Sequence, residues 1–345
     1  MRWIGIKEIE DLATISYGSF DKVLEAGLIV FYDSNSGINI CSAQSFDPNC
    51  NRIESGSSDY YLIGGNLCLK FGNEIRKIDL TSCTSTVLCK TDRNNISLIN
   101  QEYCRGSSSF TKPRRKINDI ISIRNAEVIY SWEDNKALIS WSAKYPIFFN
   151  KESEKLFAFD LSGDKVLWNI ILDKGFAGVS YVQEVNDREL FLQRYLQFEE
   201  YNLLKIDVIT GSIVWEAINT LNHYNYEASS CKLYGIGGKT FEVINAKTGE
   251  REIQQELSED LHISSHLTYY YNGLLYFSGY QDKNIPVFGA VDVENGELVF
   301  TQEVEMPGEK SFRKGLDRPV VVGNRLYVRD SMKTLHVYER VEDSL

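Results

Sequence analysis

The sequence predicts an all-β protein built from repeated four-stranded antiparallel units, and three observations support this. A short motif, consisting of two strand-like segments around a tight turn, recurs along the chain. Aromatic residues make up 12% of the chain, with 20 Tyr and 17 Phe, and such side chains favour pleated, half-buried strands. Alternating segments of strand length are separated by turns that contain Gly, Asn and Asp.

The motif is clearest from about residue 155 onward. We define its marker as the acidic or amide residue that ends the first segment, and a large apolar residue follows eight positions later. The clear pairs of marker and apolar residue are Asp160 and Trp168, Asp207 and Trp215, Asn245 and Ile253, and Asp292 and Phe300. Glu339 is a fifth marker, and successive markers are 47, 38, 47 and 47 residues apart.

Weaker copies extend the pattern towards the N-terminus. Asp79 continues the series of markers, Arg124 takes the marker position eight residues before Trp132 although it is neither acidic nor an amide, and one further step back falls near Ser42 and Ala43. These positions bring the number of markers to eight. We therefore expect eight repeats, with seven as the alternative because the first and third copies are poorly defined.

Each repeat is predicted to hold four short strands. In the copy around Asp207 they read SYVQEV, ELFLQRYL, YNLLKIDV and IVWEAI. Thr-Gly and Asn-Gly turns supply a residue with positive φ, and the marker side chain can accept hydrogen bonds from the backbone of the turn. A four-stranded repeat with a period in the forties is typical of a β-propeller blade.

The two ends of the chain indicate how the propeller closes. The last copy, TLHVYERV, lacks a fourth strand, while the chain begins with an unassigned strand, MRWIGI. If that strand completes the last blade, no long open edge remains. We expect residues 1–345 to form a single β-propeller domain that the N-terminal strand closes in this way.

Large apolar side chains on the outer strands are expected to be buried against a neighbouring blade. The predicted blade-docking residues are Trp3, Trp132, Trp168, Trp215 and Phe300.

The run formed by Asp207, Thr210, Gly211 and Trp215 resembles the tryptophan-docking repeat of pyrroloquinoline-quinone (PQQ) type β-propellers. This family, often eight-bladed, includes quinone-dependent dehydrogenases. It also includes cofactor-free scaffolds, such as the outer-membrane assembly lipoprotein of the β-barrel insertion machinery. The dehydrogenases carry adjacent cysteines and a calcium-binding set of side chains, and this sequence has no positions that match them. The resemblance therefore implies the scaffold type, with no cofactor.

Net charge and composition indicate which classes of partner and which cellular compartment to expect. A net charge of −11 argues against a general nucleic-acid binder and suits a basic protein partner. No apolar run approaches the length of a membrane span, and no secretory signal is visible. The seven cysteines include no CxxC pair, which favours reduced thiols. We expect a cytoplasmic monomer that contacts neither nucleic acid nor membrane.

Motifs that could carry chemistry are weak. His262 and His266 have an HxxxH spacing, but no third ligand is evident, so we predict no metal site. The glycine-rich segment at 235–239 lacks the context of a phosphate-binding loop. No nucleophile, base and acid can be assembled from the strand positions, and we predict no catalytic residues.

Recognition is predicted on the longer loops. In an antiparallel blade, the turns between strands 1–2 and 3–4 lie on one face, whereas the 2–3 loops and the blade-to-blade connections lie on the other. The second set is longer here and is rich in aromatic and basic residues, which are typical interface anchors. The predicted partner-binding residues are Phe176, His223, Tyr224, Tyr226, His262, Phe312, Arg313 and Lys314.

The sequence thus predicts a non-catalytic, protein-binding propeller. One concrete version is an acidic inhibitor, for instance an immunity-type protein that neutralises a bacterial toxin. The alternative is an enzyme or small-ligand binder that uses the central channel of a PQQ-like propeller. A cluster of carboxylates or a bound cofactor in the channel would favour that alternative.

Overall fold

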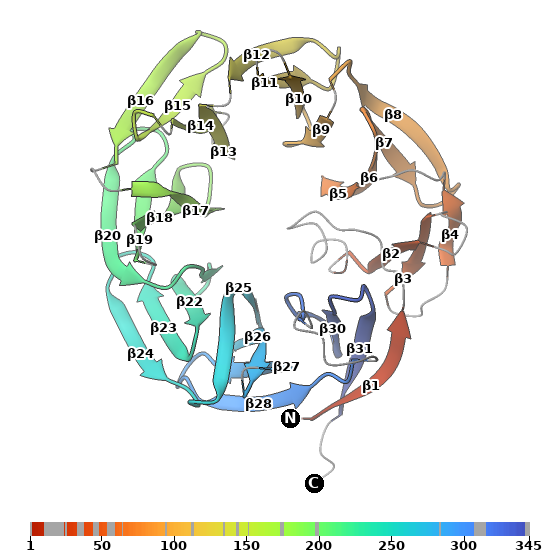
Figure 1. Ribbon diagram of the computed structural model, residues 1–345, viewed down its shortest axis with the longest axis vertical. Helices are drawn as coiled ribbons and strands as arrows, with labels where there is room; N and C mark the ends of the chain where they lie inside the picture. Colours follow the sequence, from red (N-terminus) through yellow and green to blue (C-terminus); the bar gives the residue numbers. More distant parts are fainter. Residues whose placement is uncertain are drawn as a thin grey trace. The chain divides into compact units, whose positions relative to one another are not determined.

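The computed structural model describes residues 2–9, 24, 26–32, 38–43, 48–53, 59–63, 65–93, 95–111, 114–133, 135–142, 145–150, 152–172, 176–196, 200–282, 284–306 and 315–341. Its named elements, β1 to β31, are β-strands (Figure 1). None of the described residues forms a helix long and apolar enough to cross a membrane. The chain divides into two compact units, residues 9–136 and residues 1–8 with 137–345. The expectation of one domain over residues 1–345 stays a prediction.

The unit of residues 9–136 holds three antiparallel sheets whose strands follow chain order. The first is β2 (Leu28–Tyr32), β3 (Ile38–Ser42) and β4 (Pro48–Ile53). The second is β5 (Asp59–Ile63), β6 (Asn66–Phe71), β7 (Glu74–Asp79) and β8 (Thr84–Lys90). The third is β9 (Asn95–Leu98), β10 (Tyr103–Thr111), β11 (Arg114–Ser122) and β12 (Val128–Glu133).

The other unit holds five four-stranded sheets. The first two are β13 (Lys136–Ser142), β14 (Tyr145–Asn150), β15 (Lys155–Asp160) and β16 (Lys165–Ile171), then β17 (Phe176–Glu184), β18 (Glu189–Leu196), β19 (Tyr201–Asp207) and β20 (Ile213–Thr220). The next two are β21 (Asn225–Glu227), β22 (Lys232–Gly237), β23 (Thr240–Asn245) and β24 (Arg251–Glu256), then β25 (Leu261–Tyr271), β26 (Leu274–Gln281), β27 (Ile285–Asp292) and β28 (Leu298–Glu303). The last is β29 (Val320–Val322), β30 (Arg325–Arg329), β31 (Leu335–Val341) and β1 (Arg2–Ile9).

The described residues thus form eight sheets, which confirms the count of eight repeats over seven. The markers from Asp160 to Asp292 each end the third strand of a sheet, as predicted. The prediction for the N-terminus is also confirmed, because β1 pairs with β31 at the edge of the last sheet. Figure 1 shows β1, in red, beside β31, in dark blue, although the two strands come from opposite ends of the sequence.

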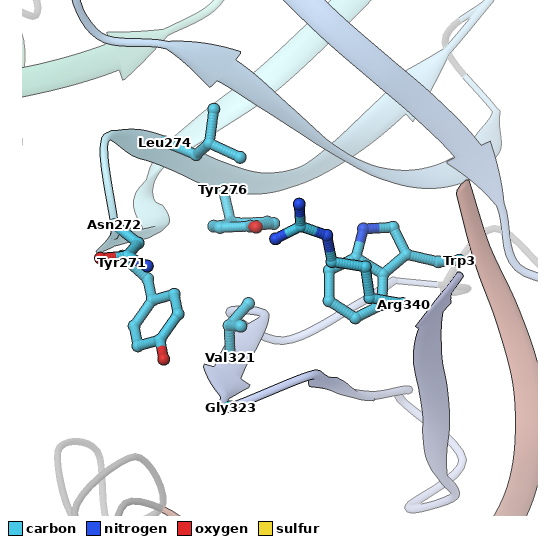
Figure 2. Close-up of a pocket in the computed structure, with 8 residues that line it drawn as sticks. All are labelled: Trp3, Tyr271, Asn272, Leu274, Tyr276, Val321, Gly323 and Arg340. Atoms are coloured by element: carbon cyan, nitrogen blue, oxygen red, sulfur yellow. The ribbon is translucent and has the colours of Figure 1, made fainter. Parts of the chain in front are cut away.

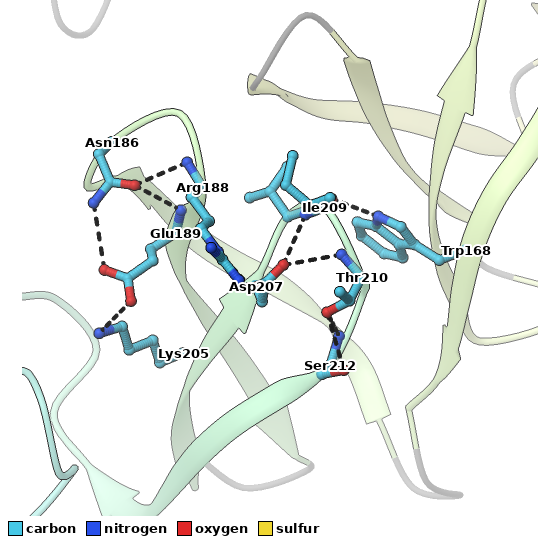
Figure 3. Close-up of polar contacts among 10 residues, drawn as sticks. Trp168, Asn186, Arg188, Glu189, Lys205, Asp207, Ile209, Thr210 and Ser212 are labelled. Atoms are coloured by element: carbon cyan, nitrogen blue, oxygen red, sulfur yellow. Dashed lines mark hydrogen bonds and ion pairs between the residues drawn. The ribbon is translucent and has the colours of Figure 1, made fainter.

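The marker side chain shapes the turn that follows it (Figure 3). Asp207 Oδ1 accepts hydrogen bonds from the backbone N–H groups of Ile209 and Thr210 at 3.0 and 2.9 Å. The N–H of Gly211 donates to the carbonyl of Asp207 at 2.8 Å, and Gly211 has φ +73°, which glycine adopts at little cost. Asn245 and Asp292 hold their turns in the same way.

Each of these turns receives a side chain from the preceding sheet. The indole of Trp168 on β16 donates from Nε1 to the carbonyl of Val208 at 2.6 Å, and a Cβ on Gly211 would lie 2.6 Å from the ring. One sheet further on, Trp215 donates to the carbonyl of Ala246 at 3.2 Å. The predicted burial between sheets is therefore confirmed for Trp168, whereas Trp215 lies between sheets but is only half-buried.

A β-bulge precedes Trp168 on β16 and Trp215 on β20, and each indole contacts the next sheet. Ile213 pairs with Ile206 and Trp215 pairs with Lys205, so Val214 has no partner on β19. Pairing shifts at the equivalent place in the β15–β16, β23–β24 and β27–β28 ladders. A bulge bends its strand and redirects the side chains beyond it, so the outer strand can face a neighbour.

The other predicted docking residues are buried or half-buried, each in its own way. Trp132 donates to the carbonyl of Lys136 at 2.9 Å and stacks on Tyr130 of its own strand. Phe300 packs edge-on against Tyr276 and Phe288 of its own sheet. Trp3 also meets Tyr276 edge-on, so it contacts the preceding sheet, whereas Trp168 and Trp215 contact the following one.

A buried histidine links the closing strand to the last sheet. His336 on β31 lies 3.0 Å from Asp330 Oδ2 through Nε2 and 3.2 Å from Glu8 Oε1, on β1, through Nδ1. Burial alone would lower the pKa of His336. Hydrogen bonds to Asp330 and the charges of Asp330 and Glu8 outweigh burial, and the pKa is raised.

This contact predicts a pH dependence of stability. Because the folded-state pKa of His336 is raised, its stabilisation is fully present below the unfolded value of about 6.5 and is lost as the pH rises through the folded value. The thermal midpoint of the wild type should therefore fall over that window relative to His336→Gln, which does not titrate. His262→Gln, which changes an exposed histidine, should keep the wild-type profile. Identical pH profiles for wild type and His336→Gln would refute the assignment.

Candidate functional site

The predicted anchor Tyr224 is not on the surface. Its side chain is fully buried in a cluster that contains Phe191 and Leu233. The hydroxyl accepts a hydrogen bond from the N–H of Leu221 at 2.8 Å and donates to Glu242 Oε1 at 2.5 Å. The prediction of Tyr224 as a contact residue is therefore wrong, because this connection folds inward to fill the space between two sheets.

Two further predicted residues are half-buried. Tyr226, on β21, packs edge-on against Phe191 with ring centroids 5.5 Å apart. Burial, and secondarily the charge of nearby His266, lower the pKa of His223 to about 4, so this imidazole is neutral at physiological pH. Neither side chain is freely available to a partner.

His262 and His266 are both exposed on β25. The strand is irregular between them, because Ile263 pairs with Gly279 but the next pair begins only at Thr268. The regular alternation that would place both imidazoles on one side is therefore broken. No group of three or more His, Cys, Asp or Glu side chains that could hold a metal ion is found among the residues that the structure describes.

Four predicted contact residues remain, and three of them lie outside the described residues. Phe176 begins β17. Phe312, Arg313 and Lys314 lie outside the described residues. The eight predicted residues are thus not brought together as one site in the described structure.

The structure instead shows a cavity of about 270 Å³ between the sheet β25–β28 and the last sheet (Figure 2). The first sheet contributes residues around its β25–β26 turn, and the second contributes residues from all strands but β30. The lining residues are Trp3, Tyr271, Asn272, Leu274, Tyr276, Val321, Gly323 and Arg340.

The polar side chains of this cavity include hydrogen-bond donors on Trp3, Tyr276 and Arg340, and the amide of Asn272, which can both donate and accept. Trp3 is 4% exposed, and its buried Nε1 has no hydrogen-bond partner in the described structure. Tyr276 is 3% exposed, and burial raises the pKa of its hydroxyl to about 12 although the charge of Arg340 opposes this. Arg340 is exposed and forms no ion pair with the described residues, and the lining contains neither Asp nor Glu.

A second unpredicted feature is an apolar outer surface on two adjacent sheets. Six branched aliphatic side chains that are 42–64% exposed lie on β16, on β20 and in the turn before β20. These residues, which we call the β16–β20 surface, are Val166, Ile171, Ile209, Ile213, Val214 and Ile218. Sequence reasoning missed them because apolar residues on strands were expected to be buried.

The repeat itself could have identified both features. At the positions equivalent to Ile209, Ile213, Val214 and Ile218, the following sheet carries Lys247, Arg251, Glu252 and Glu256, all exposed. Arg340 likewise follows the marker Glu339 at a position where the copies around Asp207, Asn245 and Asp292 carry an apolar residue. Comparing the copies position by position would have shown both differences.

Comparison with solved structures shows the β-propeller fold. The computationally designed Ika8 protein matches with a TM-score of 0.63 and 8% identity, over 97% of this chain and 98% of that one. BamB from Moraxella catarrhalis matches with a TM-score of 0.58 and 9% identity over 100% of both chains. The Dos1 propeller matches with a TM-score of 0.58 and 9% identity, over 98% of this chain and 95% of that one. No family model and no curated protein matches the sequence.

The burial of Tyr224 predicts a structural role for its hydroxyl. Tyr224→Phe should lower the free energy of unfolding by about 1–3 kcal/mol, because buried Glu242 loses a donor and the N–H of Leu221 loses an acceptor. Tyr226→Phe, at a half-buried ring, should stay within about 0.5 kcal/mol of wild type. Urea unfolding of both variants provides the measurement. Wild-type stability of Tyr224→Phe would contradict this role.

Proposed function

We propose that the chain is a non-catalytic β-propeller that binds another protein through the β16–β20 surface. The observation that carries this proposal is the exposure of six branched aliphatic side chains on two adjacent sheets. Exposed apolar side chains that gather on one part of a protein surface often mark a site of protein binding.

The contrast with the next sheet strengthens the argument. The four positions of β20 and its turn that are apolar in this surface are all charged around β24. Outer strands are normally protected from association by charged side chains, and β24 follows that rule. The apolar residues on β20 depart from it, and exposed aliphatic residues at equivalent positions on β16 (Val166) and β28 (Leu298 and Val299) do so as well.

The partner is proposed to contact side chains rather than to add a strand. The pairing of β20 with β19 shifts at Val214 and again between Ala217 and Thr220, and Asn219 in the second irregularity has φ +53°. Bulges of this kind twist an edge away from regular pairing. The exposed aliphatic groups, rather than a row of free backbone groups, are therefore the recognition elements.

The net charge of this chain indicates the charge expected on the partner around the apolar contact. With a net charge of −11, the chain attracts a basic protein and repels an acidic one. An acidic inhibitor of the immunity type, cytoplasmic and monomeric, is one concrete version of this proposal. Nucleic acid, membranes and cofactors have no part in it. The alternative of an enzyme or ligand binder that uses a central channel stays a prediction.

The test compares two apolar-to-lysine changes at equally exposed sites. The partner is first identified by affinity capture from the native host, and its binding to purified variants is measured by calorimetry. Ile218→Lys, at a side chain 63% exposed, should weaken binding by about tenfold or more, because the lysine ammonium would have to be desolvated in an apolar contact. Met332→Lys, at a side chain 62% exposed, makes the same charge change outside this surface and should bind like wild type.

Equal affinity of Ile218→Lys and Met332→Lys would show that the binding surface lies elsewhere. Association with a basic partner should also slow as salt is added, because steering between opposite charges is screened. Turnover of a quinone or sugar by the purified chain would overturn the non-enzymatic proposal.

A further inference from the structure

We propose that the cavity between the sheet β25–β28 and the last sheet binds a carboxylate that is attached to a short apolar group. This inference concerns a different place on the molecule from the β16–β20 surface and does not depend on a protein partner.

The lining of the cavity contains hydrogen-bond donors and one positive charge, but no carboxylate. The Arg340 guanidinium, the Trp3 indole N–H and the Tyr276 hydroxyl all belong to its lining (Figure 2). The Trp3 Nε1 is buried without a partner, which ordinarily costs free energy in a folded protein. With no carboxylate in the lining, an anion is the ligand that would satisfy these groups together, and a planar carboxylate suits the fork of a guanidinium.

Arg340 stands at a position that three other sheets of its unit fill with buried apolar residues. In four sheets the residue after the marker donates its N–H to the backbone of the turn between strands 1 and 2. These bonds run from Val208 to Arg188, from Ala246 to Cys231, from Val293 to Gly273 and from Arg340 to Asn324. The first three donors are at most 6% exposed, whereas Arg340 is exposed. The backbone therefore places no demand for arginine here.

The cavity lies between the sheet β25–β28 and the last sheet, and the N-terminal strand β1 completes that last sheet. We call the space between two successive sheets a junction. In that sheet the fourth strand is β1, so no turn of the Asp207 type joins strands 3 and 4. At an earlier junction such a turn places Gly211 directly beneath the indole of Trp168. At this junction Phe300 packs on its own sheet, and Arg340 occupies the wall of the space between the sheets.

Size and lining define the rest of the ligand. A volume of about 270 Å³ is slightly below the range of about 300–1,000 Å³ for sites of drug-sized molecules, so the cavity suits one small group. Leu274, Val321 and the rings of Tyr271 and Tyr276 provide an apolar wall. A small branched carboxylic acid and the C-terminal residue of a peptide share this chemistry.

The first experiment compares N-acetyl-leucine with N-acetyl-leucinamide, which has the same shape but no charge, by chemical-shift titration of the indole and tyrosine signals. The acid should bind and the amide should bind at least about tenfold more weakly, because hydrogen bonds to charged groups are the stronger ones. Extending the acid to a hexapeptide that ends in leucine separates the two sources. Tighter binding of the peptide indicates a peptide C-terminus, and its exclusion indicates a free small acid.

The matched variant is Arg340→Val, which restores the kind of residue that Val208 and Val293 provide in other sheets. It should remain folded, with a thermal midpoint at or above that of wild type, and should bind the acid at least about tenfold more weakly. Arg124→Val, which removes an exposed arginine from the turn between β11 and β12, should bind like wild type. Equal binding of acid and amide, unchanged binding by Arg340→Val, or no binding at about 10 mM acid would each overturn the proposal.

Discussion

The structure depends on a short contact between the end of one strand and the turn that follows it. A carboxylate or amide at the marker position accepts backbone hydrogen bonds from the turn, and a glycine with positive φ closes it. The missing Cβ of that glycine leaves room for an indole from the preceding sheet, whose Nε1 bonds to the carbonyl after the marker. The same contact thus shapes the turn and joins two sheets, and a bulge follows it in the next strand.

This dependence makes departures from the repeat informative. Where copies agree, as in the marker and the glycine, the residue serves the fold. Where one copy differs at a position whose backbone geometry is unchanged, the fold does not explain the difference. Arg340 is such a departure, whereas the exposed apolar residues of β20 differ from β24 but have counterparts on β16 and β28. Arg340 and the β16–β20 surface are the two parts of the chain that we propose to take part in binding.

Much of the fold could be predicted from the sequence because the repeat is a one-dimensional signal. Spacing between markers gave eight sheets, and the unassigned segment at residues 1–6 indicated the pairing of β1 with β31. The candidate sites were harder to predict, because exposure depends on how sheets meet. The composition of the loop around Tyr224 is typical of a recognition loop, yet the hydroxyl of Tyr224 donates a hydrogen bond to buried Glu242. The bulges that expose Val214 and Ile218 have no clear sequence pattern, since β-branched residues suit regular strands equally well.

The most direct test of the central claim compares two glycines of one unit with nearly the same backbone. Gly211 has φ +73° and Gly273 has φ +79°, but a Cβ would meet the Trp168 ring at 2.6 Å in the first case and nothing within 4 Å in the second. Both alanine variants should lose about 1–2 kcal/mol of unfolding free energy to the left-handed backbone, and Gly211→Ala should lose a further 1–3 kcal/mol or so to the clash. Measured by urea unfolding, equal losses in the two variants would contradict the claim that the tryptophan-on-glycine contact holds neighbouring sheets together.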